Sequence, residues 1–328
     1  MAIRRSASLC YLAAFFVVTA HAQGGAIGIP GLGFAHDASS HLIRSINGIP
    51  GAATIGEAAD GSRFSFAEIS PGQDLALALS TADRRLYAVR LPAVDEYAIA
   101  GATPALSRIV FSPAGRSAVL VGERLQILTG LPASPTVVDL AEPASVLETG
   151  MIAITDDAQQ LLLSSTDGGT TTLWLVVPGS APQPLPLSSP MAAAAFRPGG
   201  HDAIAVTRSG DIFLIQNPRQ SVHIRLIFAG DSRTSDPVAI RLSADGKTAY
   251  TVSSRGIVTS VDLLAGSAAS AQCDCQPTGL YPMRSDSLFR ITEISDSPMK
   301  LFDASAPLPR VWFVPVDMAV AAAGGGEG

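Results

Sequence analysis

Leu242-Ser-Ala-Asp-Gly-Lys-Thr-Ala-Tyr-Thr-Val252 is the segment that indicates the fold of this chain most clearly. It places a large apolar residue before Ser-Ala-Asp-Gly, and it ends in residues typical of β-strands. Gly supplies positive φ without steric cost, and Ser and Asp side chains hydrogen-bond to nearby backbone, so Ser-Ala-Asp-Gly favours a tight turn. Ile240 and Leu242 lie two residues apart, the spacing that puts both side chains on one face of a strand. The stretch therefore predicts two strands joined by a tight turn.

The same pattern occurs six times along the chain, as in an internal repeat. The residue that follows the large apolar residue marks each copy. The six markers are Ser70, Ser112, Thr155, Arg197, Ser243 and Arg284. Successive markers lie 42, 43, 42, 46 and 41 residues apart. A spacing this even predicts repeated structural units of one size.

Each repeat contains four candidate strands. One strand ends at the marker, and a second follows the turn, as in residues 75–79, 118–121, 161–163, 203–206, 249–252 and 288–291. A third begins about 15 residues past the marker, as in 86–89 and 212–215, and a fourth about 26 past it, as in 137–140 and 311–314. The segments alternate with a period of 2, which excludes helical repeats. Four strands in about 43 residues is the period of a β-propeller blade.

A seventh, degenerate repeat fits before Ser70. Counting back one period places residues 34–36, 42–46 and 52–56 at the second, third and fourth strand positions. Residues 23–27 supply an innermost strand poorly, whereas residues 315–323 resemble residues 190–196, which lead an interior repeat. We therefore expect an all-β propeller of seven blades, each with four antiparallel strands, and a ring closed by the N- and C-terminal strands. Six blades plus an N-terminal hairpin is the alternative.

The N-terminus has the features of a secretory signal peptide. Arg4 and Arg5 precede an apolar run over 9–20, and Ala20-His21-Ala22 is a small-residue cleavage pattern. The run is too short to span a bilayer. We expect a signal peptide over 1–22, a single propeller domain over 23–320 and a disordered tail over 321–328. The expected location is periplasmic or extracellular (secreted), with no membrane insertion after cleavage.

Charge restricts the partners that the protein can bind. The net charge of the chain is −6, and removal of residues 1–22 takes away two arginines and no acid, leaving −8. Lys247 and Lys300 are the only lysines, so no polybasic segment exists. Nucleic acids and anionic membranes both require basic clusters, so neither is an expected partner. We expect a monomer.

The repeats resemble those of bacterial propellers of the YVTN/WD40-like group, in which an apolar strand, a Ser-Pro-Asp-Gly-like turn and a second apolar strand recur. Leu242–Val252 is the best copy, and the resemblance covers roughly residues 28–320. The chain departs from the eukaryotic WD40 pattern, because it has no repeated Gly-His or Trp-Asp dipeptides. The resemblance implies the fold and not the function, since propellers host many unrelated activities.

Cys273 and Cys275 are the only cysteines after residue 22. A disulfide or redox-active pair is the preferred interpretation for an exported protein. Cα atoms two apart on an extended strand lie about 7 Å from each other, at the limit of disulfide geometry, so a bend is needed, and Pro277 favours one. Two unreacted thiols or half of a metal site are the alternatives. The histidines are scattered and are expected in surface loops, so no metal site is expected.

Glu68, Arg108 and Arg241 are candidate channel or ligand residues. Each lies two or four residues before its marker on a strand predicted to be innermost. Such positions approach the central channel, and ligand sites favour concave, preformed places. The alternative is ion pairing between blades or a solvated channel lining.

No catalytic motif and no cofactor motif occurs in the sequence. We therefore expect a non-catalytic binding or scaffold protein that recognises a protein, peptide or glycan through loops on one face. The alternative is a funnel-site enzyme, such as a lactonase-like protein or a glycan-active hydrolase or lyase. It requires titratable side chains from several blades to converge. A purely structural surface or adhesion protein is a third alternative.

Overall fold

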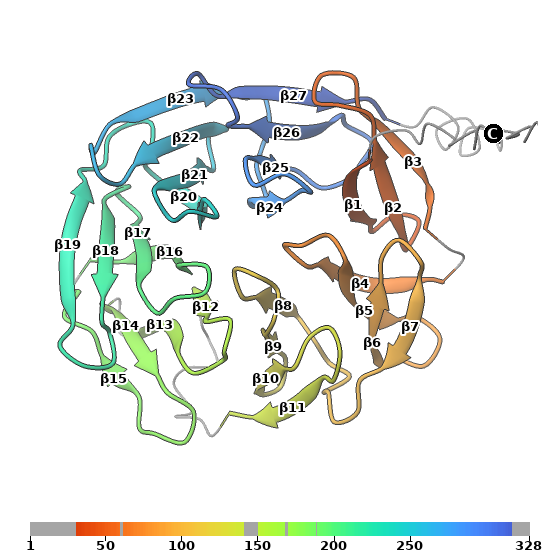
Figure 1. Ribbon diagram of the computed structural model, residues 1–328, viewed down its shortest axis with the longest axis horizontal. Coiled ribbons are helices and arrows are strands. Elements are labelled where there is room, and N and C mark those ends of the chain that lie inside the picture. Colours follow the sequence, from red (N-terminus) through yellow and green to blue (C-terminus); the bar gives the residue numbers. More distant parts are fainter. Residues whose placement is uncertain (1–30, 60–61, 141–149, 168–169, 188, 317–328) are drawn as a thin grey trace, which may run out of the picture.

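The computed structural model describes residues 31–59, 62–140, 150–167, 170–187 and 189–316. The regular structure in these ranges is all β-strand, and they contain no helix with the length and apolarity needed to cross a membrane. The strands form seven sheets around a common axis (Figure 1). The chain is therefore a seven-bladed β-propeller, as the repeats predict.

The strands follow one another in chain order from blade to blade. Blade 1 contains β1 (Gly31–Asp37), β2 (Leu42–Asn47) and β3 (Thr54–Ala58), and blade 2 contains β4 (Phe64–Ile69), β5 (Leu75–Ser80), β6 (Leu86–Arg90) and β7 (Asp95–Ala98). Blade 3 contains β8 (Arg108–Phe111), β9 (Ala118–Val121), β10 (Leu125–Thr129) and β11 (Thr136–Asp139), and blade 4 contains β12 (Ile152–Ile154), β13 (Leu161–Asp167), β14 (Thr170–Val176) and β15 (Gln183–Pro184). Blade 5 contains β16 (Met191–Phe196), β17 (Ala203–Thr207), β18 (Ile212–Gln216) and β19 (His223–Phe228), and blade 6 contains β20 (Pro237–Leu242), β21 (Thr248–Ser253), β22 (Ile257–Asp262) and β23 (Ala268–Gln272). Blade 7 contains β24 (Tyr281–Pro282), β25 (Leu288–Arg290), β26 (Met299–Asp303) and β27 (Arg310–Val314).

Blades 2–7 each pair four antiparallel strands in chain order, and the first strand lies nearest the axis (Figure 1). In blade 1, β1, β2 and β3 occupy the second, third and fourth positions, which confirms the register counted back from Ser70. The fourth-position strand was predicted two residues too early. Gly48 and Gly51 have φ of 105° and 85°, and the Ala52 amide donates to the Ile49 carbonyl at 2.9 Å, so a turn occupies the start of the predicted range. Residues 315 and 316 are described and follow β27 without regular structure. The rest of the innermost strand expected from the chain ends, the signal peptide and the tail lie outside the described residues.

A turn built around the marker hydroxyl follows the innermost strand. The Ser243 amide donates to the Thr248 carbonyl at 2.9 Å, and the Ser243 Oγ accepts from the Thr248 amide at 3.0 Å. The Gly246 amide donates to the Ser243 carbonyl at 2.9 Å, and the φ of 66° at Gly246 is one that Gly adopts freely. The hydroxyls that accept in the same way in other blades belong to Ser70, Ser112 and Thr155. Local hydrogen bonding therefore explains why Ser or Thr occupies most marker positions.

The core consists of seven apolar clusters, one between each pair of neighbouring blades. Each cluster combines residues of two blades, and alternate residues of one strand enter opposite clusters. On β5, Leu75 and Leu77 face blade 3, whereas Ala76 and Ala78 face blade 1. Burial on both faces explains why these strands are continuously apolar instead of alternating with polar residues.

The seventh cluster closes the ring. It joins β1 and β2 to β25 and β26 and includes Ile46, Leu288 and Leu301. The Arg284 amide also donates to the Leu32 carbonyl at 2.9 Å, which links blade 7 to blade 1 through the backbone. Blade 1 is therefore a full member of the ring, and the alternative of six blades plus a hairpin is wrong.

Candidate functional site

The innermost strands β4, β8, β12, β16, β20 and β24 line a central cavity of about 290 Å³, which we call the channel. Glu68, Arg108 and Arg241 all line it, so the structure brings together the three charged residues selected from the sequence. Much of the remaining wall is apolar and small, and includes Ala192–Ala195. Small side chains leave an open space where six strands converge.

Arg241 and Glu68 lie at the same level of the channel, one residue before the ends of β20 and β4. Arg241 Nε donates to the Leu280 carbonyl at 3.3 Å, which anchors the side chain to blade 7. Burial raises the pKa of Glu68 to about 7, with the nearby Arg290 and Arg241 opposing the rise and Glu293 adding to it. Burial also lowers the pKa of Arg241. Glu68 is therefore close to half-protonated at neutral pH.

Arg108 occupies a different level of the channel. It is the first residue of β8, two residues further from its marker than Glu68 and Arg241 are from theirs, which corresponds to about 7 Å along a strand. Its Nη1 donates to the Gly150 carbonyl at 3.0 Å, and burial lowers its pKa. The channel thus carries a guanidinium at each of two depths.

Tyr281, Arg290 and Glu293 form a second polar group beside Glu68. The Arg290 guanidinium lies 4.0 Å from the centre of the Tyr281 ring and forms an ion pair with Glu293. Burial raises the pKa of Tyr281 to about 12, so its hydroxyl stays protonated and donates to the Thr278 carbonyl at 3.4 Å. Sequence reasoning missed all three residues, because Arg290 and Glu293 belong to β25 and the loop after it and carry no repeat signal.

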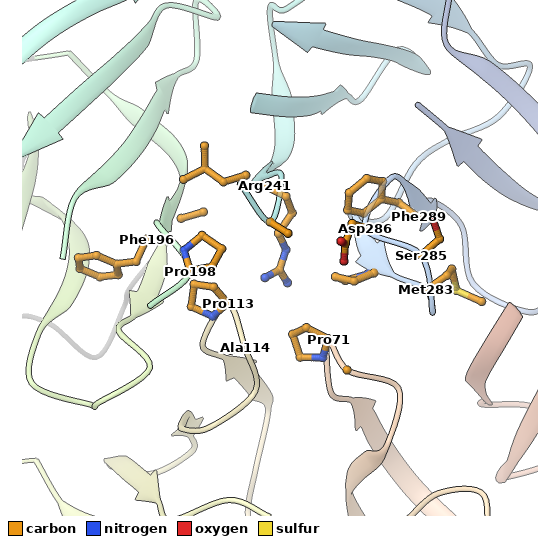
Figure 2. A pocket seen from close by; sticks show the side chains of 15 residues that line it. Pro71, Pro113, Ala114, Phe196, Pro198, Arg241, Met283, Ser285, Asp286 and Phe289 are labelled. Carbon is orange, nitrogen blue, oxygen red and sulfur yellow. The ribbon is translucent and has the colours of Figure 1, made fainter. Parts of the chain in front are cut away.

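The channel opens on the side of the marker turns into a pocket of about 280 Å³, which we call the turn mouth. Figure 2 shows the Arg241 guanidinium pointing into its centre, with Pro113 and Pro198 on one side, Asp286 on the other and Pro71 below it. Arg241 lines both the channel and the turn mouth. The rest of the turn-mouth wall is mainly apolar, with Leu242, Met283 and Phe289 among its residues.

The turns around the mouth are held together by Asp156. Its carboxylate accepts from the Ala114 amide at 2.7 Å and from the Gly199 amide at 2.8 Å, so it connects blades 3, 4 and 5. Arg197 Nη2 continues the connection to blade 6 through the Asp245 carbonyl at 3.2 Å. These hydrogen bonds hold the turns of blades 3 to 6 together on that part of the rim before any ligand binds.

Cys273 and Cys275 lie away from the channel and form a disulfide with Cα atoms 5.3 Å apart. This separation is shorter than that of an extended strand, because the chain leaves β23 at Gln272 and bends there. Cys273 is buried in the cluster between blades 6 and 7. The pair takes no part in lining the channel or the turn mouth.

The histidines differ from one another in environment. The surface-loop interpretation is wrong for His36, which lies on β1 and is buried, because its Nε2 packs 2.9 Å from the Phe64 carbonyl of β4 in the neighbouring blade. His201 lies beside its turn and pairs with Asp157 at 2.8 Å. Within the described ranges, no three His, Cys, Asp or Glu side chains are grouped so as to hold a metal ion.

No protein-family model and no curated protein sequence matches this chain. Solved structures do resemble it. A functionally unknown protein from Desulfotomaculum acetoxidans is 15% identical with a TM-score of 0.57, over 87% of this chain and 99% of that one. A putative 6-phosphogluconolactonase from Bacteroides uniformis is 13% identical with a TM-score of 0.55, over 88% and 96%. The dihydro-heme d1 dehydrogenase NirN is 18% identical with a TM-score of 0.50, over 78% and 56%. At these identities the similarity supports the propeller fold alone.

Proposed function

We propose that this protein is an exported, non-catalytic binding propeller that takes a peptide segment of a partner protein at the turn mouth. The observation that carries the proposal is the composition of that mouth. Mainly apolar side chains, with four prolines among them, surround the Arg241 guanidinium, and Asp286 lies on the opposite side of the pocket. Binding sites of this kind combine an apolar wall with a few fixed polar groups that orient the ligand.

A peptide fits the turn mouth better than a glycan does. A glycan presents many hydroxyl groups and requires several hydrogen-bonding side chains, whereas most residues around this mouth are Pro, Ala, Leu, Met and Phe. Apolar side chains of a peptide can bury against Pro71, Pro113 and Pro198. Because the rim is already held by Asp156, little conformational entropy is lost when a peptide binds.

Export is supported by the signal-peptide features of residues 1–22 and by the disulfide between Cys273 and Cys275, since disulfides persist in oxidising compartments. The marker turns support grouping the chain with bacterial YVTN/WD40-like repeats. We therefore propose that the protein acts in the periplasm or outside the cell.

Peptide selection tests the proposal. A random heptapeptide library displayed on phage is selected against the exported protein, and the enriched peptides are synthesised and titrated by calorimetry. Ala114 is exposed on the rim, and Ala114→Trp fills the mouth, so we expect it to weaken peptide binding by at least about 10-fold. Ala265 is exposed in the turn between β22 and β23, so Ala265→Trp is the matched control and should bind normally. Failure to enrich any peptide, or equal binding by Ala114→Trp, contradicts the proposal.

One observation favours a funnel-site enzyme as a second candidate. A carboxyl group with a pKa of about 7 is suited to general acid–base catalysis, and Glu68 has such a pKa in a cavity. A lactonase-like enzyme or a glycan-active hydrolase or lyase would use Glu68 in this way. Its test is turnover of a panel of lactones and glycosides by the wild-type protein and Glu68→Gln. Turnover that disappears in Glu68→Gln establishes the enzyme and overturns the non-catalytic proposal.

A further inference from the structure

We propose that the channel is a binding site for a carboxylate group, held between the guanidinium groups of Arg241 and Arg108 and beside the carboxyl group of Glu68. This inference rests on the proposed function and deepens it, because it identifies the acidic group of a docked peptide as the part that enters the channel. The same chemistry can also come from a free organic acid. The two sources are separated in the experiment below.

The charge inside the channel is opposite to that of the whole protein. The chain has a net charge of −6, whereas the channel is lined by two guanidinium groups and one carboxyl group that is partly neutral. Apolar walls such as Ala192–Ala195 lower the local dielectric and strengthen the field of these groups. An anion that reaches the channel is therefore attracted there, although most of the surface repels it.

Arg241 connects the turn mouth to the channel, and so it meets an incoming group first. Its Nε is fixed by the Leu280 carbonyl, while Figure 2 shows the end of the guanidinium pointing into the pocket. A guanidinium has five N–H donors in a planar fork that matches a carboxylate. Arg108 is fixed by the Gly150 carbonyl and adds positive charge about 7 Å deeper, two residues along the strand.

Glu68 makes the site specific for a carboxylate and couples carboxylate binding to the uptake of a proton. When protonated, its carboxyl group has one O–H donor that a carboxylate accepts. The charged and titratable groups that face it come from four elements: Arg241 on β20, Tyr281 on β24, Arg290 on β25 and Glu293 in the loop after β25. A second carboxylate nearby disfavours the ionised form of Glu68. Since the pKa of Glu68 is already about 7, binding at pH 7 takes up about 0.5 proton.

Calorimetry with a defined small acid tests the site without a peptide. The probe is N-acetyl-L-glutamate, which stays ionised between pH 6 and pH 8, and its neutral diamide is the matched control. Titrations are run in Tris and in triethanolamine, two cationic buffers that differ in their heat of ionisation. The difference between the heats measured in the two buffers gives the number of protons taken up on binding. We expect saturable binding of the acid alone, proton uptake at pH 7, and binding about 10-fold weaker at pH 8 than at pH 6.

Variants separate the roles of the three residues. We expect Arg241→Gln and Arg108→Gln each to weaken binding by about 10-fold or more, since each removes a charged contact. Arg219→Gln, at an exposed position on the loop between β18 and β19, is the matched control and should not change binding. Glu68→Gln should bind without proton uptake and without the pH dependence. Thermal melts establish that each variant is folded. Arg241→Gln and Arg108→Gln each test the carboxylate site independently of the other.

Failure of this inference can be distinguished from failure of the proposed function. If selected peptides bind at the turn mouth but N-acetyl-L-glutamate gives no saturable heat, or binds equally to both arginine variants, the carboxylate site is overturned and the peptide site remains. If the acid binds as expected but no peptide is enriched, the channel holds a free organic acid. A selected peptide whose acidic residue can become an amide without loss of affinity also contradicts the carboxylate site.

Discussion

Gln73 connects three blades through one side-chain amide. It lies in the turn between β4 and β5 with a φ of 58°, and it is 2% exposed. Its Oε1 accepts from the Phe34 amide of β1 at 2.5 Å, and its Nε2 donates to the Pro282 carbonyl of β24 at 2.6 Å. Because the Pro282 carbonyl can only accept, the orientation of the amide is fixed. The side chain satisfies one buried and one partly buried backbone group, which belong to different blades.

Replacing Gln73 by Leu should lower the free energy of unfolding by about 2–4 kcal/mol, since it leaves a buried N–H and a partly buried C=O without partners. Urea denaturation measures this loss. Gln220→Leu is the matched control, because Gln220 is exposed in the loop between β18 and β19 and should change stability by less than about 0.5 kcal/mol. Equal stability of the two variants would show that the Gln73 bridge is unimportant.

Glu68 should make stability fall as the pH rises. Its pKa is raised from 4.5 to about 7 in the folded protein, so the folded state binds the proton more tightly than the unfolded state. The stabilisation from that proton is complete below about pH 4.5 and is lost as the pH rises through 7, and the change is about 3 kcal/mol. His36 has a lowered pKa and acts in the opposite direction, but it is present in both the wild type and Glu68→Gln. Urea denaturation at pH 5 and pH 8 should therefore show a stability difference between the two proteins that changes with pH, and a constant difference would refute the raised pKa.

The disulfide between Cys273 and Cys275 predicts how many cysteines react with iodoacetamide before and after reduction. Cys273 and Cys275 are joined, and Cys10 precedes the expected cleavage site. Iodoacetamide should therefore add no group to the exported, denatured protein before reduction and two groups after it. Intact-mass measurement distinguishes these states, and two groups before reduction would mean that the cysteines are free thiols in the exported protein.

At the scale of the element, the blade is organised around its marker turn. The chemistry of that turn is local, because Ser243, Gly246 and Thr248 hydrogen-bond within one short stretch. Because these hydrogen bonds are local, they restrict the residue types within one short stretch of sequence. The positions of the second strands, which follow the turns, could therefore be predicted closely. Blade 1 has no such turn among its described residues, and its last strand was misplaced by two residues.

Contacts between elements could be predicted only in part. Phe111 and Phe196 directly precede two of the markers, and both pack between neighbouring blades, so the repeat pattern does locate such core positions. The burial of His36 and the Tyr281–Arg290–Glu293 group were not foreseen, because these contacts join residues from different strands. A repeat pattern records the register of each strand, but it carries no information on which polar side chains meet across the ring.

The interface between blades 4 and 5 should be sensitive to loss of volume. Phe196 is 1% exposed, and Phe196→Ala removes a ring from a closed cluster, so we expect a loss of about 3–5 kcal/mol in the free energy of unfolding. Phe111→Ala, between blades 2 and 3, should lose a similar amount. Phe313 is 61% exposed on β27, so Phe313→Ala is the matched control and should be nearly neutral in the same urea titration. A neutral Phe196→Ala would contradict the packing between these blades.

At the scale of the whole molecule, the ring explains both the stability and the candidate site. Seven sheets arranged about one axis bury both faces of each blade and bring six innermost strands to one channel (Figure 1). Convergence on the axis places Glu68, Arg108 and Arg241 in one cavity although 173 positions separate Glu68 from Arg241 in the sequence. The sequence predicted which positions face inward, whereas their mutual arrangement depends on closure of the ring.

Closure of the ring through blade 1 predicts that the protein unfolds cooperatively. Leu301 is fully buried between blades 7 and 1, and Leu162 is fully buried between blades 4 and 5. In a closed ring both leucines are fully buried between neighbouring blades, so Leu301→Ala and Leu162→Ala should each lower the free energy of unfolding by about 2–5 kcal/mol. Each variant should also unfold in a single transition, because opening any one interface exposes the faces of two blades. In a ring with a loose seam, Leu301→Ala would cost much less than Leu162→Ala, and blade 1 would separate in an early step. Urea denaturation followed by both tryptophan fluorescence and circular dichroism distinguishes the two cases, since two transitions that do not coincide would mean that the ring is not closed through blade 1.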